Sequence, residues 1–226
     1  MAKPHKPHPH RDRGKPGPGA PPARERESAG TAAGAVVNRR AGDRLRSGHL
    51  WVYASDVVSV ALPDNGSSHP PALLPVADAR GILLGTALYS PSSQIALRMI
   101  SRDAIGEAEW LELLDTRLRR AIASREPLLD EENDACRLCF SEADQLPGLI
   151  VDKYGSLVIL QLLVKGLNSD TVRETCIRVL REELEPEANP LSIVERPDPR
   201  VRELEGLAAP QQEPLWPRDA DAIRAT

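Results

Sequence analysis

The chain has 226 residues, a formal net charge of −4, 41% hydrophobic and 3% aromatic residues, and three cysteines. This length allows one or two domains, whose cores must be mainly aliphatic because aromatic residues are scarce. No apolar run is long enough to span a membrane, the basic N-terminus lacks the apolar stretch of a secretory signal, and three cysteines make no disulfide framework, so we expect a cytoplasmic protein with no membrane partner.

Residues 1–33 are rich in Pro, Gly, Ala, Arg and His and show no apolar periodicity. Such a segment buries too little apolar surface to offset its conformational entropy, so we expect a disordered basic tail. Its histidines at positions 5, 8 and 10 are only a weak compositional hint of metal binding. Residues 104–226 carry 15 basic and 25 acidic side chains, so a polyanion is expected to contact the front of the chain instead.

Residues 34–103 have the pattern of a small all-β domain. Short β-branched and apolar runs recur in AVVNRR, LWVYASDVVSVAL, PALLPVADARGILLGTALYS and QIALRMIS. A turn is expected at Asp78–Gly81. Several short strands at this spacing predict a small barrel.

Residues 104–226 predict an α+β domain. The clearest helix is expected over 107–125, where Trp110, Leu114 and Leu118 recur at helical spacing and acidic residues precede arginines. CRLCFSE, GLIVDKYG, LVILQLLV and LSIVER predict strands, and SDTVRETCIRVLREEL predicts a second helix that is capped at its first residues.

Neither the cysteines nor the glycines indicate a metal or cofactor site. CRLC at Cys136–Cys139 is one pair, which is half of a four-ligand zinc site, and strand positions three apart face opposite sides. We therefore expect buried thiols and no metal. GKPGPG lies in the tail and GILLG within predicted β structure, so neither is the strand–glycine–helix turn that a nucleotide-like cofactor requires.

The segment RRAGDRLRSGHLWVY, Arg39–Tyr53, is the candidate RNA-binding segment. Guanidinium groups contact phosphates, and aromatic rings stack on unpaired bases. The alternative is a charged turn that enters a strand whose Trp51 is a core residue. The candidate contact residues are Arg39, Arg40, Arg44, Arg46, Ser47, Gly48, His49, Trp51 and Tyr53.

SEADQLPGLIVDKYG, Ser141–Gly155, places a rigid acidic corner directly against a predicted strand. Glu142 and Asp144 could act as a general acid or base, or could accept hydrogen bonds from backbone N–H groups at the Leu146–Gly148 turn. Because no His, metal or cofactor loop stands near them in the sequence, the pattern favours the structural role, and no catalytic residue is assigned.

Three motifs, RLRSGHLWVY, RLCFSEADQLPGLIVDKYG and VERPDPRVRELEGL, stand in the order and at intervals similar to those of a bacterial family. Over residues 36–210 the chain resembles the S-adenosylmethionine-dependent methyltransferases that modify carbon 5 of cytosine in large-subunit ribosomal RNA. Leu50 stands where the family usually has Pro, and Gln145 where it usually has Gly. The resemblance implies a PUA-type RNA-binding β-barrel at 34–103 and a small α+β middle domain at 104–226.

In that family a Rossmann-like domain follows, which holds S-adenosylmethionine and a catalytic cysteine. The resemblance therefore implies that this chain is a truncated, RNA-binding portion that binds no cofactor itself, and that Cys136, Cys139 and Cys176 are not the catalytic thiol. Ribosomal RNA is the implied partner, with a separately encoded catalytic domain as a further candidate. The alternatives are a stand-alone PUA-type RNA-binding protein without methyltransferase activity, or an inert interaction fragment. The residues implied to face the interdomain cleft are Glu142, Asp144, Pro147, Gly148 and Asp152.

Overall fold

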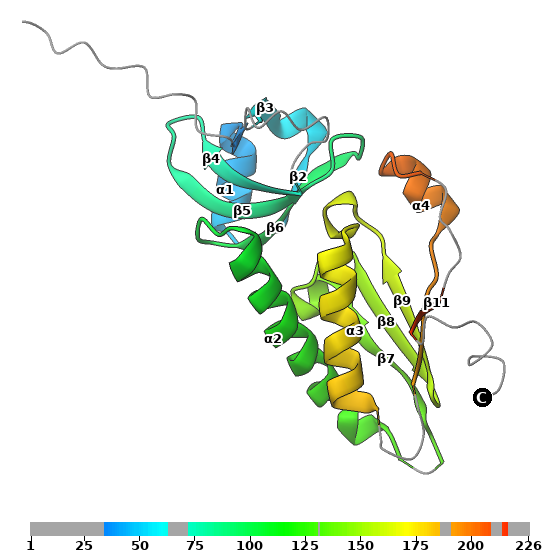
Figure 1. Cartoon of the computed structure of the whole chain (residues 1–226). Coiled ribbons are helices and arrows are strands. Elements are labelled where there is room, and N and C mark those ends of the chain that lie inside the picture. Colours follow the sequence, from blue (N-terminus) through cyan, green and yellow to red (C-terminus); the bar gives the residue numbers. More distant parts are fainter. Residues whose placement is uncertain (1–33, 63–71, 131, 186–190, 209–213, 217–226) are drawn as a thin grey trace, which may run out of the picture. The chain divides into compact units, whose positions relative to one another are not determined.

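Two β-sheets and their helices make up the part of the chain that the computed structural model describes (Figure 1). The described residues are 34–62, 72–130, 132–185, 191–208 and 214–216. They all lie within one compact unit, Ala32–Thr226. The tail predicted for residues 1–33 and its histidines lie outside the described residues.

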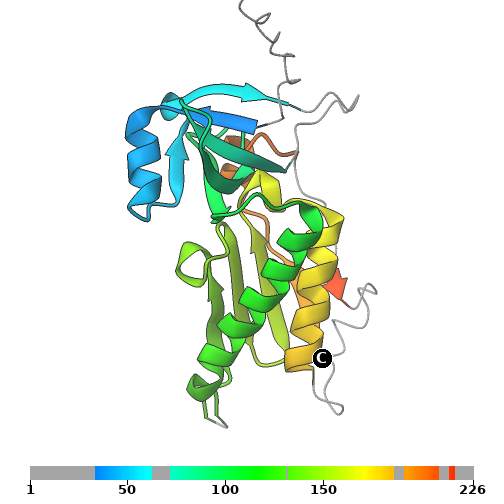
Figure 2. The ribbon, with the colours of Figure 1, turned by 90° about the vertical axis from the view of Figure 1, so that its left-hand side faces the viewer.

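The first sheet has six strands in the order β2-β6-β5-β4-β1-β3. These strands are β1 (Gly34–Val37), β2 (Trp51–Tyr53), β3 (Val57–Ala61), β4 (Leu73–Asp78), β5 (Leu83–Tyr89) and β6 (Ile95–Ser101). Strands β1 and β4 are parallel, whereas the other neighbouring pairs are antiparallel. The sheet curls around an aliphatic core (Figure 2). Because β2 and β3 are its two edges, closure into a full barrel stays a prediction.

Helix α1 (Arg39–Arg46) corrects the prediction that residues 34–103 are all β. The side chain of Asn38 caps this helix by accepting the N–H of Ala41 at 2.8 Å. Ala41 and Leu45, one turn apart, are buried in the core of the first sheet, and the arginines lie on the outer side. A helix of two turns shows its apolar period only once, so the sequence pattern was too short to reveal it.

The second sheet has the order β11-β10-β9-β8-β7. Its strands are β7 (Ala135–Phe140), β8 (Leu149–Tyr154), β9 (Leu157–Leu162), β10 (Ser192–Glu195) and β11 (Pro214–Trp216). Strands β9 and β10 are parallel and the remaining pairs antiparallel. The mixed α/β character that the sequence predicted for this region is confirmed.

Helices α2 (Glu107–Arg125) and α3 (Asp170–Leu184) lie side by side against one face of the second sheet (Figures 1 and 2). The bounds of α2 are those that the sequence predicted, and Ser169 caps α3 by accepting the N–H of Val172. A short helix, α4 (Pro199–Leu204), follows β10. Short 3-10 turns complete the elements: η1 (Ala54–Asp56), η2 (Glu126–Leu128), η3 (Ser141–Asp144) and η4 (Lys165–Leu167).

Packing joins the two sheets. Leu88 and Ile100 of the first sheet belong to the same buried cluster as the side chains of α2 and the second sheet. Arg98 of β6 also forms a buried ion pair with Glu205, which follows α4, at 3.3 Å. The predicted boundary at 103/104 thus falls where two sheets share a core, and the division into separate domains stays a prediction. None of the described helices is both long and apolar enough to cross a membrane.

Candidate nucleic-acid interface

Strand β2 presents two aromatic rings to solvent. Trp51 and Tyr53 are each 41% exposed, whereas Val52 between them is fully buried. Neighbouring strand residues point to opposite faces, so the burial of Val52 fixes both rings on the outer face. The alternative that Trp51 is a core residue is therefore wrong. Exposed rings of this kind are suited to stacking on unpaired bases.

Two of the four arginines of α1 pair with carboxylates, one at the end of turn η1 and one at the end of strand β4. Arg44 pairs with Asp56, and Arg46 pairs with Asp78 at 2.5 Å between Nη2 and Oδ2. Both carboxylates are buried, so these arginines stabilise the fold and their charge is partly compensated. Their predicted role as phosphate contacts stays a prediction.

The other two arginines of α1 are freer. The side chain of Arg39 is 94% exposed, and among the described residues its one ion-pair partner is the exposed Asp43, at 3.7 Å. Arg40 is exposed and forms no ion pair within the described residues. Exposed pairs contribute little, so both guanidinium groups remain available to an anion.

The turn from α1 to β2 brings His49 to the hollow that Arg44, Trp51 and Tyr53 also line. Ser47 donates its hydroxyl to the carbonyl of Arg44 at 2.8 Å, which ends the helix. Gly48 has a φ of 104°, a positive value that favours glycine, and the chain turns there toward β2. His49 follows and is exposed.

The acidic corner, residues 141–148, is built around Ser141. Its hydroxyl accepts the N–H of Gly148 at 2.8 Å, and its carbonyl accepts the N–H of Leu146 at 3.0 Å. The prediction that Glu142 or Asp144 accepts from the Leu146–Gly148 turn is therefore wrong, since Ser141 does so. Pro147 and Gly148 are buried, so they shape the corner but offer no side chain to a ligand.

Glu142 connects the corner to β2. Its Oε1 accepts a hydrogen bond from the indole Nε1 of Trp51 at 2.7 Å, and its Oε2 accepts one from the hydroxyl of Ser141. The tertiary structure thus brings together a residue of each candidate segment. No local sequence pattern could have indicated this pair, because Trp51 lies on β2 and Glu142 in the turn η3, 91 positions further along the chain.

Asp144 and Asp152 have structural partners instead. Asp144 accepts from Nη1 and Nη2 of Arg125 at 2.6 and 2.9 Å and from the N–H of Phe140 at 2.6 Å. Asp152 accepts from Nε and Nη2 of Arg137 at 2.7 and 3.2 Å. Both carboxylates thus accept paired hydrogen bonds from one arginine, an arrangement that suits a structural role.

Three adjoining hollows follow the corner from β2 to α2, and together we call them the corner groove. The first, of about 400 Å³, is lined by Arg44, His49, Leu50, Trp51, Tyr53 and Glu142. The second, of about 450 Å³, shares Leu50 and Glu142 and extends to Arg102 and Arg117. The third, of about 200 Å³, shares Arg117 and extends to Arg120. No sequence pattern indicated Arg102, Arg117 and Arg120, because the first directly follows β6 and the other two belong to an otherwise ordinary amphipathic helix.

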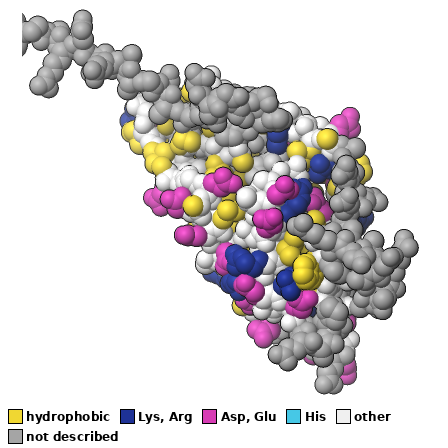
Figure 3. Space-filling model, viewed as in Figure 1, with side chains coloured by type: hydrophobic (Ala, Val, Ile, Leu, Met, Phe, Trp, Pro, Cys, Tyr) yellow, Lys and Arg dark blue, Asp and Glu magenta, His cyan; other side chains and the backbone are white. Residues whose placement is uncertain are grey.

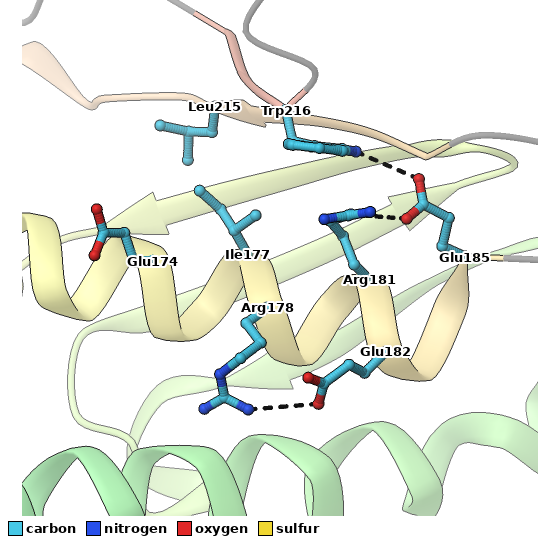
Figure 4. Close-up of a pocket in the computed structure, with 8 residues that line it drawn as sticks. All are labelled: Glu174, Ile177, Arg178, Arg181, Glu182, Glu185, Leu215 and Trp216. Carbon is cyan, nitrogen blue, oxygen red and sulfur yellow. Dashed lines mark hydrogen bonds and ion pairs between the residues drawn. The ribbon is translucent and has the colours of Figure 1, made fainter.

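A further pocket lies between α3 and β11 (Figure 4). The guanidinium of Arg181 stacks on the ring of Trp216 at 3.7 Å from its centroid. Glu185 accepts from Nε of Arg181 at 2.7 Å and from Nε1 of Trp216 at 3.3 Å. Since Arg181, Trp216 and Glu185 contact one another, the trio is suited to holding β11 on α3.

The three cysteines lie in or beside the core, as predicted. Cys139 and Cys176 are buried, and burial raises the pKa of each thiol to about 12. Burial also raises the pKa of the half-buried Cys136. Thiols with raised pKa values are poor nucleophiles at neutral pH. Within the described ranges no group of three or more His, Cys, Asp or Glu side chains could hold a metal ion.

Comparisons with known proteins place this geometry in context. Residues 35–102 match the model of the PUA-like domain. The chain is 31% identical over 182 residues to Ribosomal RNA large subunit methyltransferase I of Pseudoalteromonas translucida. The aligned region covers 79% of this chain and 42% of that relative. The protein of that name from Shewanella amazonensis is 35% identical over 161 residues, covering 70% of this chain and 38% of the relative. The chain thus spans about two fifths of the curated relatives it matches.

Solved structures show a similar fold. A candidate S-adenosylmethionine-dependent methyltransferase from Streptococcus mutans has a TM-score of 0.57 at 17% identity, covering 73% of this chain and 40% of that one. Another candidate methyltransferase, solved as a complex with SAH, has a TM-score of 0.59 at 17% identity, covering 75% and 41%. Residues 35–102 thus match a PUA-like domain, and most of the chain is similar to part of the large-subunit ribosomal RNA methyltransferases I.

Proposed function

We propose that this chain is the RNA-recognising portion of a large-subunit ribosomal RNA methyltransferase and that it binds ribosomal RNA through β2 and the turn before it. The observation that carries the proposal is the pair of exposed rings, Trp51 and Tyr53, on the PUA-like domain. A hydrogen bond to Glu142 holds the indole of Trp51, so a base would meet a ring that is already oriented.

Charged groups beside the rings supply the remaining contacts. Arg39 and Arg40 at the start of α1 are exposed, and Asp43 is the one ion-pair partner of the two within the described residues. His49 is exposed as well and lines the same hollow as both rings. Phosphate contacts position a protein on RNA, whereas stacked and hydrogen-bonded bases give it sequence preference. The arrangement of cations beside aromatic rings therefore suits unpaired RNA better than a regular duplex.

The reaction in which the chain takes part is proposed to be methyl transfer from S-adenosylmethionine to carbon 5 of a cytosine, in the cytoplasm. The residues described here do not fit that cofactor themselves. Gly106 and Gly166 are the glycines of the described strand-to-helix connections, and no connection carries a glycine-rich turn. A Cβ at Gly166 would lie 3.0 Å from the carbonyl oxygen of Ala72 and from Leu88, so the space there is filled by the first sheet.

Calorimetric titration of the chain with S-adenosylmethionine is therefore expected to show no saturable binding. Saturable binding at micromolar concentrations would contradict this. The comparisons give no support to a separately encoded catalytic partner.

RNA binding by the full chain tests the main proposal. Fluorescence anisotropy with labelled fragments of large-subunit ribosomal RNA should show binding, and Trp51→Ala and Tyr53→Ala should each weaken it roughly five- to a hundredfold, because a stacked base contributes about 1–3 kcal/mol. Tyr154→Ala is the matched control, since Tyr154 is 53% exposed on the second sheet.

The control variant should bind within about twofold of the unmodified chain, and circular dichroism should show that all three variants are folded. Equal losses for Tyr154→Ala and the β2 variants, or no RNA binding at all, would overturn the proposal.

A further inference from the structure

We propose that the bound RNA strand continues from β2 along the corner groove to Arg102, Arg117 and Arg120, which form a second set of phosphate contacts. This inference rests on the proposed function but concerns residues outside the segment from which that function was argued. It assigns part of the RNA surface to α2, in the region whose net charge predicted repulsion of phosphate.

Arg117 is the centre of this second set. Its Nη1 donates to the carbonyl of Gln145 at 2.9 Å and its Nη2 to the carbonyl of Ile100 at 2.8 Å. Both acceptors are neutral, and Arg117 forms no ion pair within the described part of the chain. Burial lowers the pKa of this guanidinium, which shows that its positive charge is desolvated without a compensating anion. A phosphate in either adjoining hollow would compensate it.

Arg102 and Arg120 extend the charge to both sides of Arg117. Arg102 is exposed and donates Nη1 to the carbonyl of Leu45 at 2.6 Å, which again is a neutral acceptor. Arg120 is exposed on α2 and lines the third hollow. Neither residue forms an ion pair with another described residue. Arg120 can therefore turn toward an anion at little cost, and Arg102 can bind one with the guanidinium nitrogens that do not contact Leu45.

Other arginines of α2 are compensated. Arg119 pairs with Asp115 at 2.8 Å and with two glutamates of α3, and Arg125 pairs with Asp144. Figure 3 shows basic and acidic side chains next to one another over α2 and α3. The uncompensated arginines thus gather at the corner groove and not along the whole helix.

The groove is continuous from the aromatic rings to these arginines. Leu50 and Glu142 line both the first and the second hollow, and Arg117, Ala143 and Gln145 line both the second and the third. Of its two carboxylates, Asp144 is paired with Arg125, whereas Glu142 is bound by two neutral donors, the indole of Trp51 and the hydroxyl of Ser141, and keeps its charge. The three arginines outnumber this one uncompensated carboxylate, so the groove carries a local excess of positive charge.

Single-stranded RNA fits this order of groups. Proteins that bind single strands combine aromatic platforms with a basic groove that follows the backbone. The acidic residues elsewhere in 104–226 act weakly on the groove, since the screening length is about 10 Å at 0.1 M salt. Local charge, and not the net charge of the region, therefore decides where phosphate binds.

The double variant Arg102→Ala, Arg120→Ala tests the inference in the full chain. Binding to a single-stranded fragment of large-subunit ribosomal RNA should weaken about tenfold at low salt, and the slope of log affinity against log salt should fall by about 1.4, since each phosphate contact on a single strand contributes ~0.7. The matched control is Arg196→Ala, Arg200→Ala, which removes two exposed arginines that form no ion pair within the described residues.

The control pair should change affinity less than about twofold. If Trp51→Ala weakens binding while the Arg102 and Arg120 pair behaves like the control, the second set of contacts is refuted and the proposed function stands. If the unmodified chain binds no RNA, both proposals fall. Arg117→Lys adds a readout, because it keeps the charge but loses the two-carbonyl fork, and it should retain more of the salt dependence than Arg117→Gln.

Discussion

The indole Nε1 of Trp51 donates a hydrogen bond to Oε1 of Glu142 at 2.7 Å, across 91 positions of the chain. Trp51 belongs to the PUA-like domain and Glu142 to the corner of the second sheet. The bond is charge-assisted but lies at the surface, where water competes for both partners. Its main consequence is therefore the orientation of an exposed ring and not the stability of the fold.

Removing the carboxylate should release the ring without unfolding the protein. Glu142→Ala is expected to lower the free energy of unfolding by no more than about 1 kcal/mol, because an exposed hydrogen bond contributes little. In NMR spectra the indole N–H signal of Trp51 should move and its hydrogen exchange should quicken. Glu142→Gln keeps an acceptor and should give an intermediate shift. An unmoved indole signal in Glu142→Ala would show that the bond is absent in solution.

Gly148 and Gly81 have nearly equal φ angles but different surroundings, so alanine substitutions at the two positions distinguish backbone strain from steric conflict. Gly148 has a φ of 81° and Gly81 a φ of 79°. A Cβ at Gly148 would lie 1.9 Å from Cγ2 of Val164, whereas a Cβ at Gly81 would have no described neighbouring atom within 4 Å. Gly81→Ala should therefore cost about 1 kcal/mol in the free energy of unfolding. Gly148→Ala should cost about 3 kcal/mol or more.

Denaturant unfolding of both variants provides the measurement. Equal losses of stability would mean that the corner relaxes around the added methyl group, and the buried position of Gly148 would then not explain why the corner is rigid.

Asp78 should make the first sheet sensitive to acid. Desolvation opposes its ionisation, but hydrogen bonds from the N–H of Ile82, from Arg46 and from Arg80 are stronger together and lower its pKa from 3.8 to about 2. The folded pKa lies below the unfolded one, so the stabilisation is fully present above pH 3.8 and is lost as the pH falls toward 2. Asp78→Asn should lower stability at neutral pH and flatten the pH dependence within that window.

Thermal unfolding at a series of pH values would measure this dependence. Asp103→Asn is the matched control, because Asp103 is exposed and forms no ion pair within the described residues. A profile for Asp78→Asn that keeps the slope of the unmodified chain between pH 4 and 2 would contradict the assignment.

The thiols should react slowly in the folded protein. Cys139 and Cys176 are buried with pKa values raised to about 12, so almost no thiolate exists at pH 8. A thiol-specific reagent should modify at most Cys136 under native conditions and all three cysteines after unfolding. Rapid native modification of two or more thiols would indicate that the core around α3 opens readily.

Local sequence patterns determined much of the fold. Helix α2 begins and ends where the apolar period of residues 107–125 does, because five turns repeat the pattern often enough to identify it. Strands β8 and β9 follow from compact apolar runs around a turn. Helix α1 was missed because two turns show the period once. The structural role of Asp144 stays a prediction, and no sequence pattern indicated its donor Arg125, because that residue lies in another element.

Only the tertiary structure decided the candidate interface. The sequence placed cations and rings in Arg39–Tyr53, but it could not show which arginines are compensated, because Asp56 and Asp78 come from other parts of the sheet. Nor could it bring Glu142 to Trp51 or Arg117 to the corner. Secondary structure follows from interactions between near neighbours in the chain, whereas the free charge and the shape of a surface depend on which distant side chains the packed sheets bring within 4 Å of one another.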